Sequence, residues 1–148
     1  MLIVALACLS LIALSTVIHY EVLRLLNARL AALRIPSRSK LLVVMFSAFI
    51  AHGLEIAVYG LALYALAHYA ALGTLSGPIG FSLVNCLYFS AETYTTLGFG
   101  DLTPTGPLRL LAGVESLNGL LLIGWSASYA YIAMERFWGS DTAVDGEK

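Results

Sequence analysis

The sequence predicts an all-α membrane protein with three transmembrane helices and a short re-entrant helix between the second and the third. Of its 148 residues, 59% are hydrophobic and only 11% are charged, which is far from the composition of a soluble domain. The apolar residues gather in three long segments, and crossing a bilayer takes about 20 residues. A fourth apolar segment is too short to cross the bilayer, but it is long enough to enter the bilayer and turn back.

The first apolar segment, residues 1–19, contains no charged residue and is predicted to be the first span. A cleaved signal peptide is the alternative, but it would need a basic start and a small-residue cleavage site, and neither is evident. Residues 20–40 then hold five of the eight basic residues. The leucines of this region share one helical face. This pattern predicts either a helix on the membrane surface that ends at Pro36 or a continuation of the first span, and the sequence leaves both open.

The second span is predicted from residue 41 to about residue 70, followed by a loop rich in glycine that also contains Pro78. Ser82 is a suitable N-cap for a short helix over 83–95. The third span is predicted over 108–134. The tail from residue 139 is short and polar, and we expect it to be disordered.

The distribution of basic residues predicts the orientation in the membrane. Residues 20–40 carry five of them, whereas the region between the second and third spans carries none before Arg109. Because basic loops stay on the cytoplasmic side, we expect the N-terminus outside and the C-terminus in the cytoplasm, in a multi-pass protein of the cell (inner) membrane.

The segment Thr96–Asp101, with the sequence TLGFGD, directly follows the short helix and carries the strongest functional signal. A dehydrated monovalent cation needs several oxygens in place of its water shell, and rows of backbone carbonyls supply them. Aiming successive carbonyls at one axis requires alternating right- and left-handed backbone. Gly98 and Gly100 reach the left-handed conformation without steric cost. The segment therefore indicates an ion selectivity filter.

Residues Tyr88–Asp101 closely resemble the pore helix and filter of tetrameric potassium channels, especially the small bacterial two-helix type. The likeness continues through Leu102, Pro104, Arg109 and Gly119 and covers roughly residues 41–138. The resemblance implies a pore module over 41–138. The first span with its basic linker (1–40) has no counterpart in the simplest two-helix channels, so no role is carried over to it, and residues 139–148 are expected to form a short cytoplasmic tail. The resemblance also implies a homotetramer in membrane lipid that binds K⁺ and other monovalent cations, with no further cofactor and no nucleic acid.

The resemblance assigns roles to four sets of residues. They are the ion-coordinating filter of Thr96, Leu97, Gly98, Phe99 and Gly100; the filter support of Glu92, Asp101, Tyr88 and Phe89; the gating hinge Gly119; and the cavity lining of Leu120, Ile123, Ala127 and Tyr131. Glu92 and Asp101 are expected to lie close together behind the filter. Plain helix packing is an open alternative for Gly119 and for the cavity-lining residues.

Two positions depart from the usual filter. Leu97 stands where valine or isoleucine is usual, and Phe99 replaces a tyrosine whose hydroxyl tethers the filter to its surroundings. A potassium-selective channel is the predicted function, with a weakly selective cation channel or a non-conducting pore-fold subunit as alternatives. An enzyme is not expected, because the sequence shows no nucleophile–base pair, phosphate-binding loop or metal-ligand cluster outside the membrane.

Polar residues inside the predicted spans form pairs three residues apart, namely His52 with Glu55 and Glu115 with Asn118. Ionisable groups at membrane depth usually find protein partners. We therefore predict one buried polar cluster that links the second span to the third. It acts either as structural glue or as a proton or metal sensor, since histidine titrates near neutral pH and binds zinc or copper. His19 and His68 lie near the predicted span ends and are expected at the interface, with no role assigned.

Overall fold

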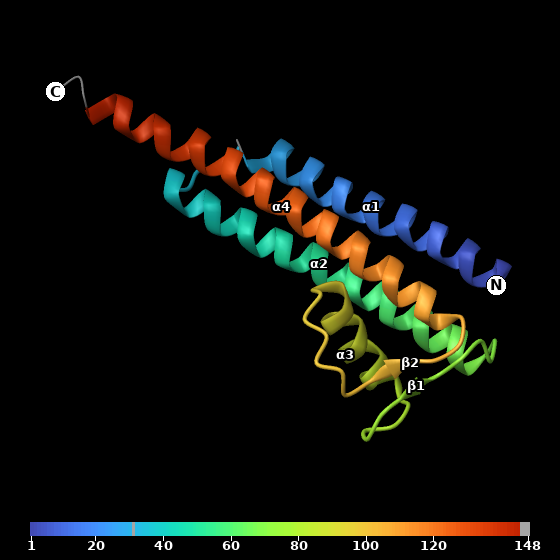
Figure 1. Cartoon of the computed structure of the whole chain (residues 1–148). Helices are drawn as coiled ribbons and strands as arrows, with labels where there is room; N and C mark the ends of the chain where they lie inside the picture. Colours follow the sequence, from blue (N-terminus) through green and yellow to red (C-terminus); the bar gives the residue numbers. More distant parts are fainter. Residues whose placement is uncertain (31, 146–148) are drawn as a thin grey trace.

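The structure is a computed structural model that describes residues 1–30 and 32–145, with the side chains of residue 38 and of residues 138–145 left undescribed. Four helices and two short strands make up the fold (Figure 1). In chain order they are α1 (Leu2–Leu30), α2 (Ser37–His68), β1 (Leu75–Ser76), α3 (Leu83–Tyr94), β2 (Thr103–Pro104) and α4 (Leu108–Asp145). The three long helices lie side by side, and α3 packs against α2 and α4 near one end of the bundle.

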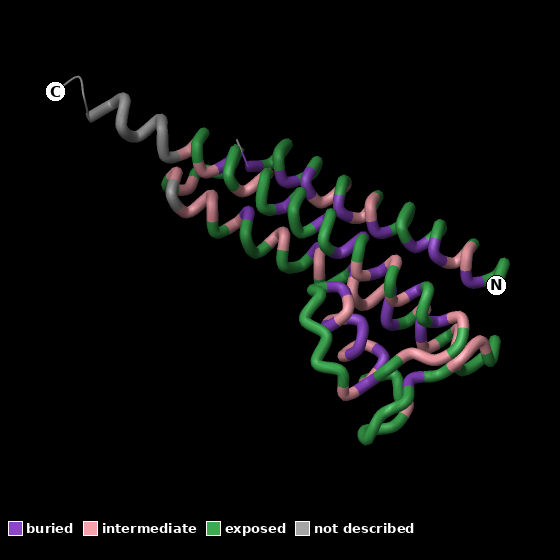
Figure 2. Tube along the Cα trace, in the orientation of Figure 1, coloured by how far each residue is buried: buried purple, intermediate pink, exposed green. Residues whose placement is uncertain are grey.

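Three helices of the described chain are long and apolar enough to cross a membrane, over residues 2–30, 39–68 and 108–137. Large apolar side chains such as Leu6, Phe46 and Leu121 point away from the bundle, as lipid-facing residues do. The buried residues instead follow the faces along which the helices meet (Figure 2). The predicted fold class, an all-α membrane protein with a short helix between the second and third spans, is confirmed.

Helix α1 is longer than the predicted first span, because it continues through the basic region to Leu30. Of the two alternatives for that region, the structure shows the continuation and not a separate surface helix. The reason is packing: Leu23 and Leu26, on the leucine face, are buried against the ends of α2 and α4. Pro36 therefore does not end a helix. It is the N-cap of α2.

Helix α4 is also longer than the predicted third span, since it continues past Met134 to Asp145. The expected disorder of the tail is therefore wrong for residues 139–145, and residues 146–148 lie outside the described part. No proline interrupts the chain after Leu108, and each further residue adds one backbone hydrogen bond to a helix that is already formed.

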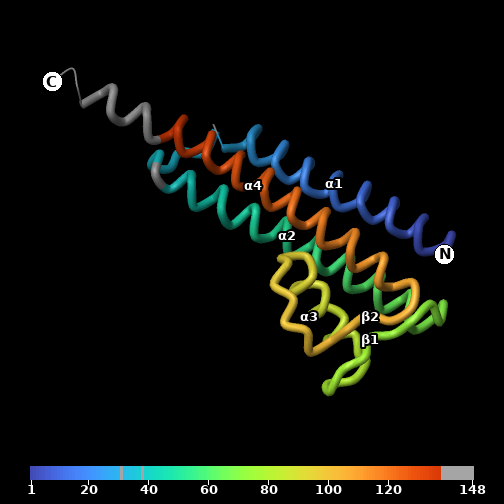
Figure 3. The backbone as a smooth tube through the Cα atoms, in the orientation of Figure 1, coloured from blue at the N-terminus to red at the C-terminus, as the bar shows by residue number. Residues whose placement is uncertain are grey.

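The ends of the bundle differ in what they carry. The N-terminus lies at the end with β1 and β2, whereas the end of α1 and the start of α2 lie at the opposite end (Figures 1 and 3). The larger hydrophobic core, built around Tyr59, Leu63 and Tyr94, lies where α3 joins the long helices. A smaller core around Leu26 and Val44 joins the three helices at the basic end.

Candidate functional site

Helix α3 aims its C-terminal end into the bundle and leads directly into the TLGFGD segment. Ser82 caps its start, with the Oγ atom accepting a hydrogen bond from the amide of Asn85 at 3.1 Å, as predicted. The helix ends at Tyr94, after which the backbone turns sharply. This arrangement places the filter segment beside the negative end of a helix dipole, which favours a cation.

The backbone of the filter segment alternates as the sequence predicted. Thr96, Gly98 and Gly100 have left-handed φ angles of 59°, 56° and 78°, and the residues between them do not have positive φ. A row of carbonyls aimed at one axis requires such an alternation. Thr96 is the one non-glycine residue of the row in this conformation, which is costly for a side chain with a branched Cβ and which the sequence did not indicate.

In the single chain, the filter segment lies open on one side. Every residue from 95 to 100 is exposed. The side chains of Leu97 and Phe99 are 59% and 66% exposed, although both are apolar. Backbone at membrane depth is covered by protein or lines a water-filled path, so this exposed face is the one that needs a partner or water beside it.

Glu92 braces the filter from behind. Its side chain is 4% exposed, and its Oε2 atom accepts a hydrogen bond from the amide of Phe99 at 3.1 Å. Its backbone carbonyl accepts from the amides of Leu97 and Gly98 at 2.8 and 3.2 Å. Three of the filter amides are therefore tied to one residue of α3, which leaves the filter carbonyls free to point elsewhere.

A second brace joins the C-terminal part of the filter segment to α3. The hydroxyl of Tyr88 donates to Oδ2 of Asp101 at 3.1 Å, and the ring of Tyr88 lies parallel to that of Phe99 with centroids 6.5 Å apart. Oδ1 of Asp101 is buried and has no hydrogen-bond partner among the described residues. In that part of the chain no hydrogen bond joins Asp101 to Glu92, and each carboxylate has a partner of its own. Phe89 belongs to the buried core.

The chain beyond the filter is fastened to the loop that precedes α3. Strand β2 pairs with β1 in antiparallel register, Leu75 opposite Pro104 and Ser76 opposite Thr103. Gly77 comes so close to the chain just before β2 that a Cβ atom there would lie 2.1 Å from the carbonyl oxygen of Asp101. The C-terminal end of the filter segment is thus held both by α3 and by the loop before it, and the sequence did not predict the pairing of β1 with β2.

Gly119 of α4 lies against the C-terminal end of α3. A Cβ atom at Gly119 would lie 2.2 Å from the carbonyl oxygen of Tyr94, so only glycine allows this approach. Close packing against α3 therefore explains why residue 119 is a glycine. Its role as a gating hinge stays a prediction. The predicted cavity-lining residues all lie on exposed surface of α4 in the single chain: Leu120, Ile123, Ala127 and Tyr131.

The sequence profile of a family described as ion channels matches residues 41–136, well over half of the chain. The chain belongs to this ion channel family. It is therefore a channel protein and not an enzyme, as the sequence predicted.

A curated relative is the inward rectifier potassium channel Kirbac3.1 of Paramagnetospirillum magnetotacticum, which is 36% identical over 76 residues. The alignment covers 51% of this chain and 26% of the relative, so the chain matches about a quarter of that protein. No solved structure matches the chain.

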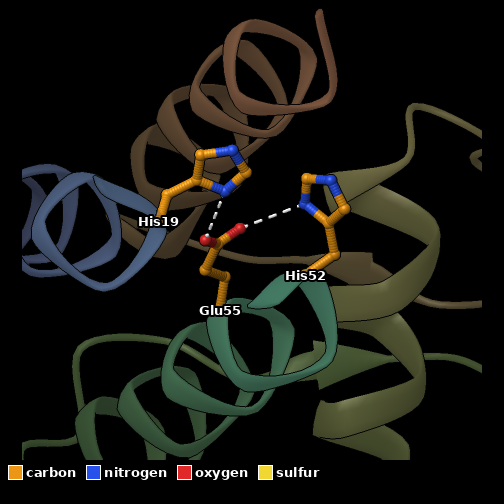
Figure 4. Close-up of side chains that lie close together, drawn as sticks. All are labelled: His19, His52 and Glu55. Atoms are coloured by element: carbon orange, nitrogen blue, oxygen red, sulfur yellow. Dashed lines mark hydrogen bonds and ion pairs between the residues drawn. The ribbon is translucent and has the colours of Figure 1, made fainter. Parts of the chain in front are cut away.

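The channel chain also buries a group of ionisable side chains between its long helices (Figure 4). His19 on α1 bonds through Nδ1 to Oε1 of Glu55 at 2.9 Å, and His52 bonds through Nδ1 to Oε2 of Glu55 at 3.2 Å. We call His19, His52 and Glu55 the histidine–glutamate cluster. The hydroxyl of Tyr94 also donates to Oε2 of Glu55. The expectation that His19 is interfacial is wrong, because α1 continues past it and buries it fully.

Glu115 and Asn118, which we expected in the same cluster, have separate partners. Glu115 accepts a hydrogen bond from Ser90 of α3. Asn118 donates to Ser15 of α1 at 2.7 Å and to Tyr59 of α2 at 3.2 Å. Among the described residues, no hydrogen bond joins Glu115 to His52 or Glu55. The single predicted cluster is therefore several polar sets, which together tie α4 to all three other helices.

Sequence reasoning missed His19 and Tyr94. The buried residues of α1 recur every three or four positions, and His19 continues the stripe that begins Val4, Cys8, Leu11 and Ser15. Small and polar residues on one stripe of an apolar helix indicate a face that contacts protein. This pattern could have predicted that His19 is buried against the other helices. Tyr94 carries no comparable signal, because its role depends on where α3 ends. His68, expected at the interface, lies at the end of α2 and stacks on Tyr64.

Proposed function

We propose that four copies of this chain form a potassium-selective channel in the cell membrane, with residues Thr96–Gly100 as its filter. The observation that carries this proposal is the alternating backbone of the filter segment, exposed on one side and braced by Glu92 on the other. Such a strip can present a row of oxygens to an ion that has shed its water. K⁺ is the ion we propose, and the partial likeness to a potassium channel supports this choice.

The homotetramer follows from what one chain lacks. A dehydrated cation needs oxygens on all sides, whereas one chain offers a single strand of them. Closing a ring of four such strands would also cover Leu97 and Phe99, which are exposed in the single chain. We propose that the filter residues Thr96, Leu97, Gly98, Phe99 and Gly100 bind K⁺ as cargo and that no other cofactor takes part in conduction.

The orientation we propose places the filter at the outer mouth of the pore. The basic residues Arg24, Arg29, Arg34 and Arg136 all lie on or beside the helix ends far from the filter. Basic residues favour the cytoplasmic side, so the N-terminus lies outside and the C-terminus inside. The inner wall of the cavity is then α4, with Leu120, Ile123, Ala127 and Tyr131 as the proposed lining.

A weakly selective cation channel is the second candidate, favoured by one observation. Phe99 has no hydroxyl, so its side chain cannot hold the filter by a hydrogen bond. The parallel ring of Tyr88 and its bond to Asp101 supply a different attachment at the same level of the filter. We propose that this attachment keeps the filter narrow enough to prefer K⁺ to Na⁺.

The test is the reversal potential of the purified protein in planar bilayers under opposed gradients of potassium and sodium chloride. A potassium-selective channel gives a reversal potential that follows the potassium gradient. A reversal potential near zero would instead establish the weakly selective pore. The absence of current under every condition would favour a non-conducting subunit.

A further inference from the structure

The histidine–glutamate cluster has a geometry that conduction does not require. Its two imidazoles and one carboxylate come from α1 and α2 and point at one another (Figure 4). One ligand atom from each residue can be chosen so that all three lie within 4.8 Å of one another. His19 and Glu55 are fully buried, and the side chain of His52 is 19% exposed. We propose that this cluster binds one divalent transition metal ion of the zinc class.

The donor set has the chemistry that such an ion prefers. Two imidazole nitrogens and one carboxylate oxygen are common ligands of Zn²⁺, which binds them at about 2.0–2.2 Å in tetrahedral geometry. Ligand atoms around such an ion lie about 3.3 Å apart. Nδ1 of His19 lies 2.9 Å from Oε1 of Glu55 and Nδ1 of His52 lies 3.2 Å from Oε2, both close to that value, while one ligand atom from each of the three residues gives separations of up to 4.8 Å. Binding an ion therefore requires the three side chains to rotate closer together around it.

The neighbours of the cluster hold its ligands in position. Oγ of Ser126 on α4 lies 3.2 Å from Nε2 of His19. When Nδ1 binds a metal, Nε2 carries the proton and donates to this hydroxyl, an arrangement typical of histidine ligands. The hydroxyl of Tyr94 donates to Oε2 of Glu55 and lies 3.0 Å from Nδ1 of His52, so it is placed to orient Glu55 or to complete the coordination.

The charge of the cluster also favours a bound cation. Glu55 is fully buried in the middle of a membrane-spanning helix, where an uncompensated carboxylate is costly. Within the described chain no lysine or arginine lies at ion-pair distance from it, and its ion-pair partners are the two histidines. Histidines compensate the charge only when protonated, whereas a divalent ion does so with both imidazoles neutral.

Of the three cluster residues, His52 is the one that reaches the surface of the single chain. His52 lines a groove between α2 and α4 with a volume of about 230 Å³, beside Phe49, Ile123 and Ala127. The partly exposed imidazole of His52 is thus the ligand an incoming ion meets first. The ion would connect α1 to α2 and, through Tyr94, to the helix that ends two residues before Thr96. This gives the first helix a role in holding the filter.

Metal binding is tested on the purified full chain in detergent, stripped of metal with a chelator and titrated with Zn²⁺ by calorimetry and with Co²⁺ by visible absorption. We expect one ion per chain and the intense absorption of a tetrahedral Co²⁺ site. In His19→Gln and His52→Gln, binding should weaken by at least about 100-fold. The matched control is His68→Gln, which removes a histidine of α2 outside the cluster and should leave the affinity unchanged.

Wild-type protein that shows no saturable binding of either ion would overturn the proposal. So would a His52→Gln variant that binds the ion as tightly as wild type, or a His68→Gln variant that loses as much affinity as the two ligand variants. If the ligand variants do not fold, Ser126→Ala keeps all three ligands and decides the question. It should weaken binding by about 10-fold, and an unchanged affinity would count against the site. No current is measured in these titrations, so the metal site can fail while the proposed conduction stands, and the reverse.

Discussion

The amide of Phe99 donates a hydrogen bond to the carboxylate of Glu92 at 3.1 Å, which fixes the middle of the filter segment to the helix that precedes it. The bond spans seven residues and bridges the turn at Thr96. Because the carbonyl of Glu92 also holds Leu97 and Gly98, this one residue controls how the filter backbone is oriented.

The first prediction concerns Gly98. Its φ is 56°, and within the single chain no atom lies near the position of a Cβ atom, so Gly98→Ala adds backbone strain of about 1–2 kcal/mol without a new contact inside its own chain. We expect selective current to be lost while the oligomer, measured by size-exclusion chromatography with light scattering, stays assembled. Gly53→Ala is the control, because Gly53 has equal room and lies within α2. Unchanged reversal potentials in Gly98→Ala would remove the filter assignment.

The second prediction concerns Glu92. Glu92→Ala removes the acceptor for the Phe99 amide, and we expect single-channel open times to shorten several-fold with little change in which ion passes. Glu92→Gln keeps a side-chain oxygen able to accept the same hydrogen bond, so its open times should stay close to wild type. Equal open times in wild type and Glu92→Ala would show that the brace has no part in gating.

The third prediction separates packing from hinging at Gly119. A methyl group there would meet the carbonyl of Tyr94, so Gly119→Ala forces α3 and α4 apart and should cost about 1–3 kcal/mol of stability. Gly124→Ala, on the same helix with no atom near the new methyl group, should preserve or slightly raise the unfolding temperature measured in detergent. A normal unfolding temperature with altered opening in Gly119→Ala would instead support the hinge.

The fourth prediction concerns Tyr88. Tyr88→Phe keeps the ring beside Phe99 but removes the hydrogen bond to Asp101, whose other oxygen is already without a partner among the described residues. The carboxylate then loses the one hydrogen bond described for it, so we expect the filter around Asp101 to loosen and the permeability of Na⁺ relative to K⁺ to rise. Tyr64→Phe is the control, because the described contact of Tyr64 with Phe81 is ring stacking, which phenylalanine keeps. A ratio of Na⁺ to K⁺ permeability in Tyr88→Phe that equals the ratio in Tyr64→Phe and in wild type would contradict the role of Tyr88.

The sequence by itself determined the features that depend on local chemistry. Apolar length predicted three spans, Ser82 predicted the start of α3, and the spacing of Gly98 and Gly100 predicted where the filter backbone turns left-handed. Each of these follows from the residue itself and its close neighbours in the chain, because span length, capping and φ preference are local properties.

Tertiary structure decided which helices meet and at what depth. Periodicity showed that His52 and Glu55 share a face, but it could not show that this face meets His19, 36 residues before Glu55. It also could not separate Glu115 from that cluster or place Gly119 under the carbonyl of Tyr94. A helix repeats every 3.6 residues whatever its neighbours are, so its rotation and its depth are set only when the helices pack against one another.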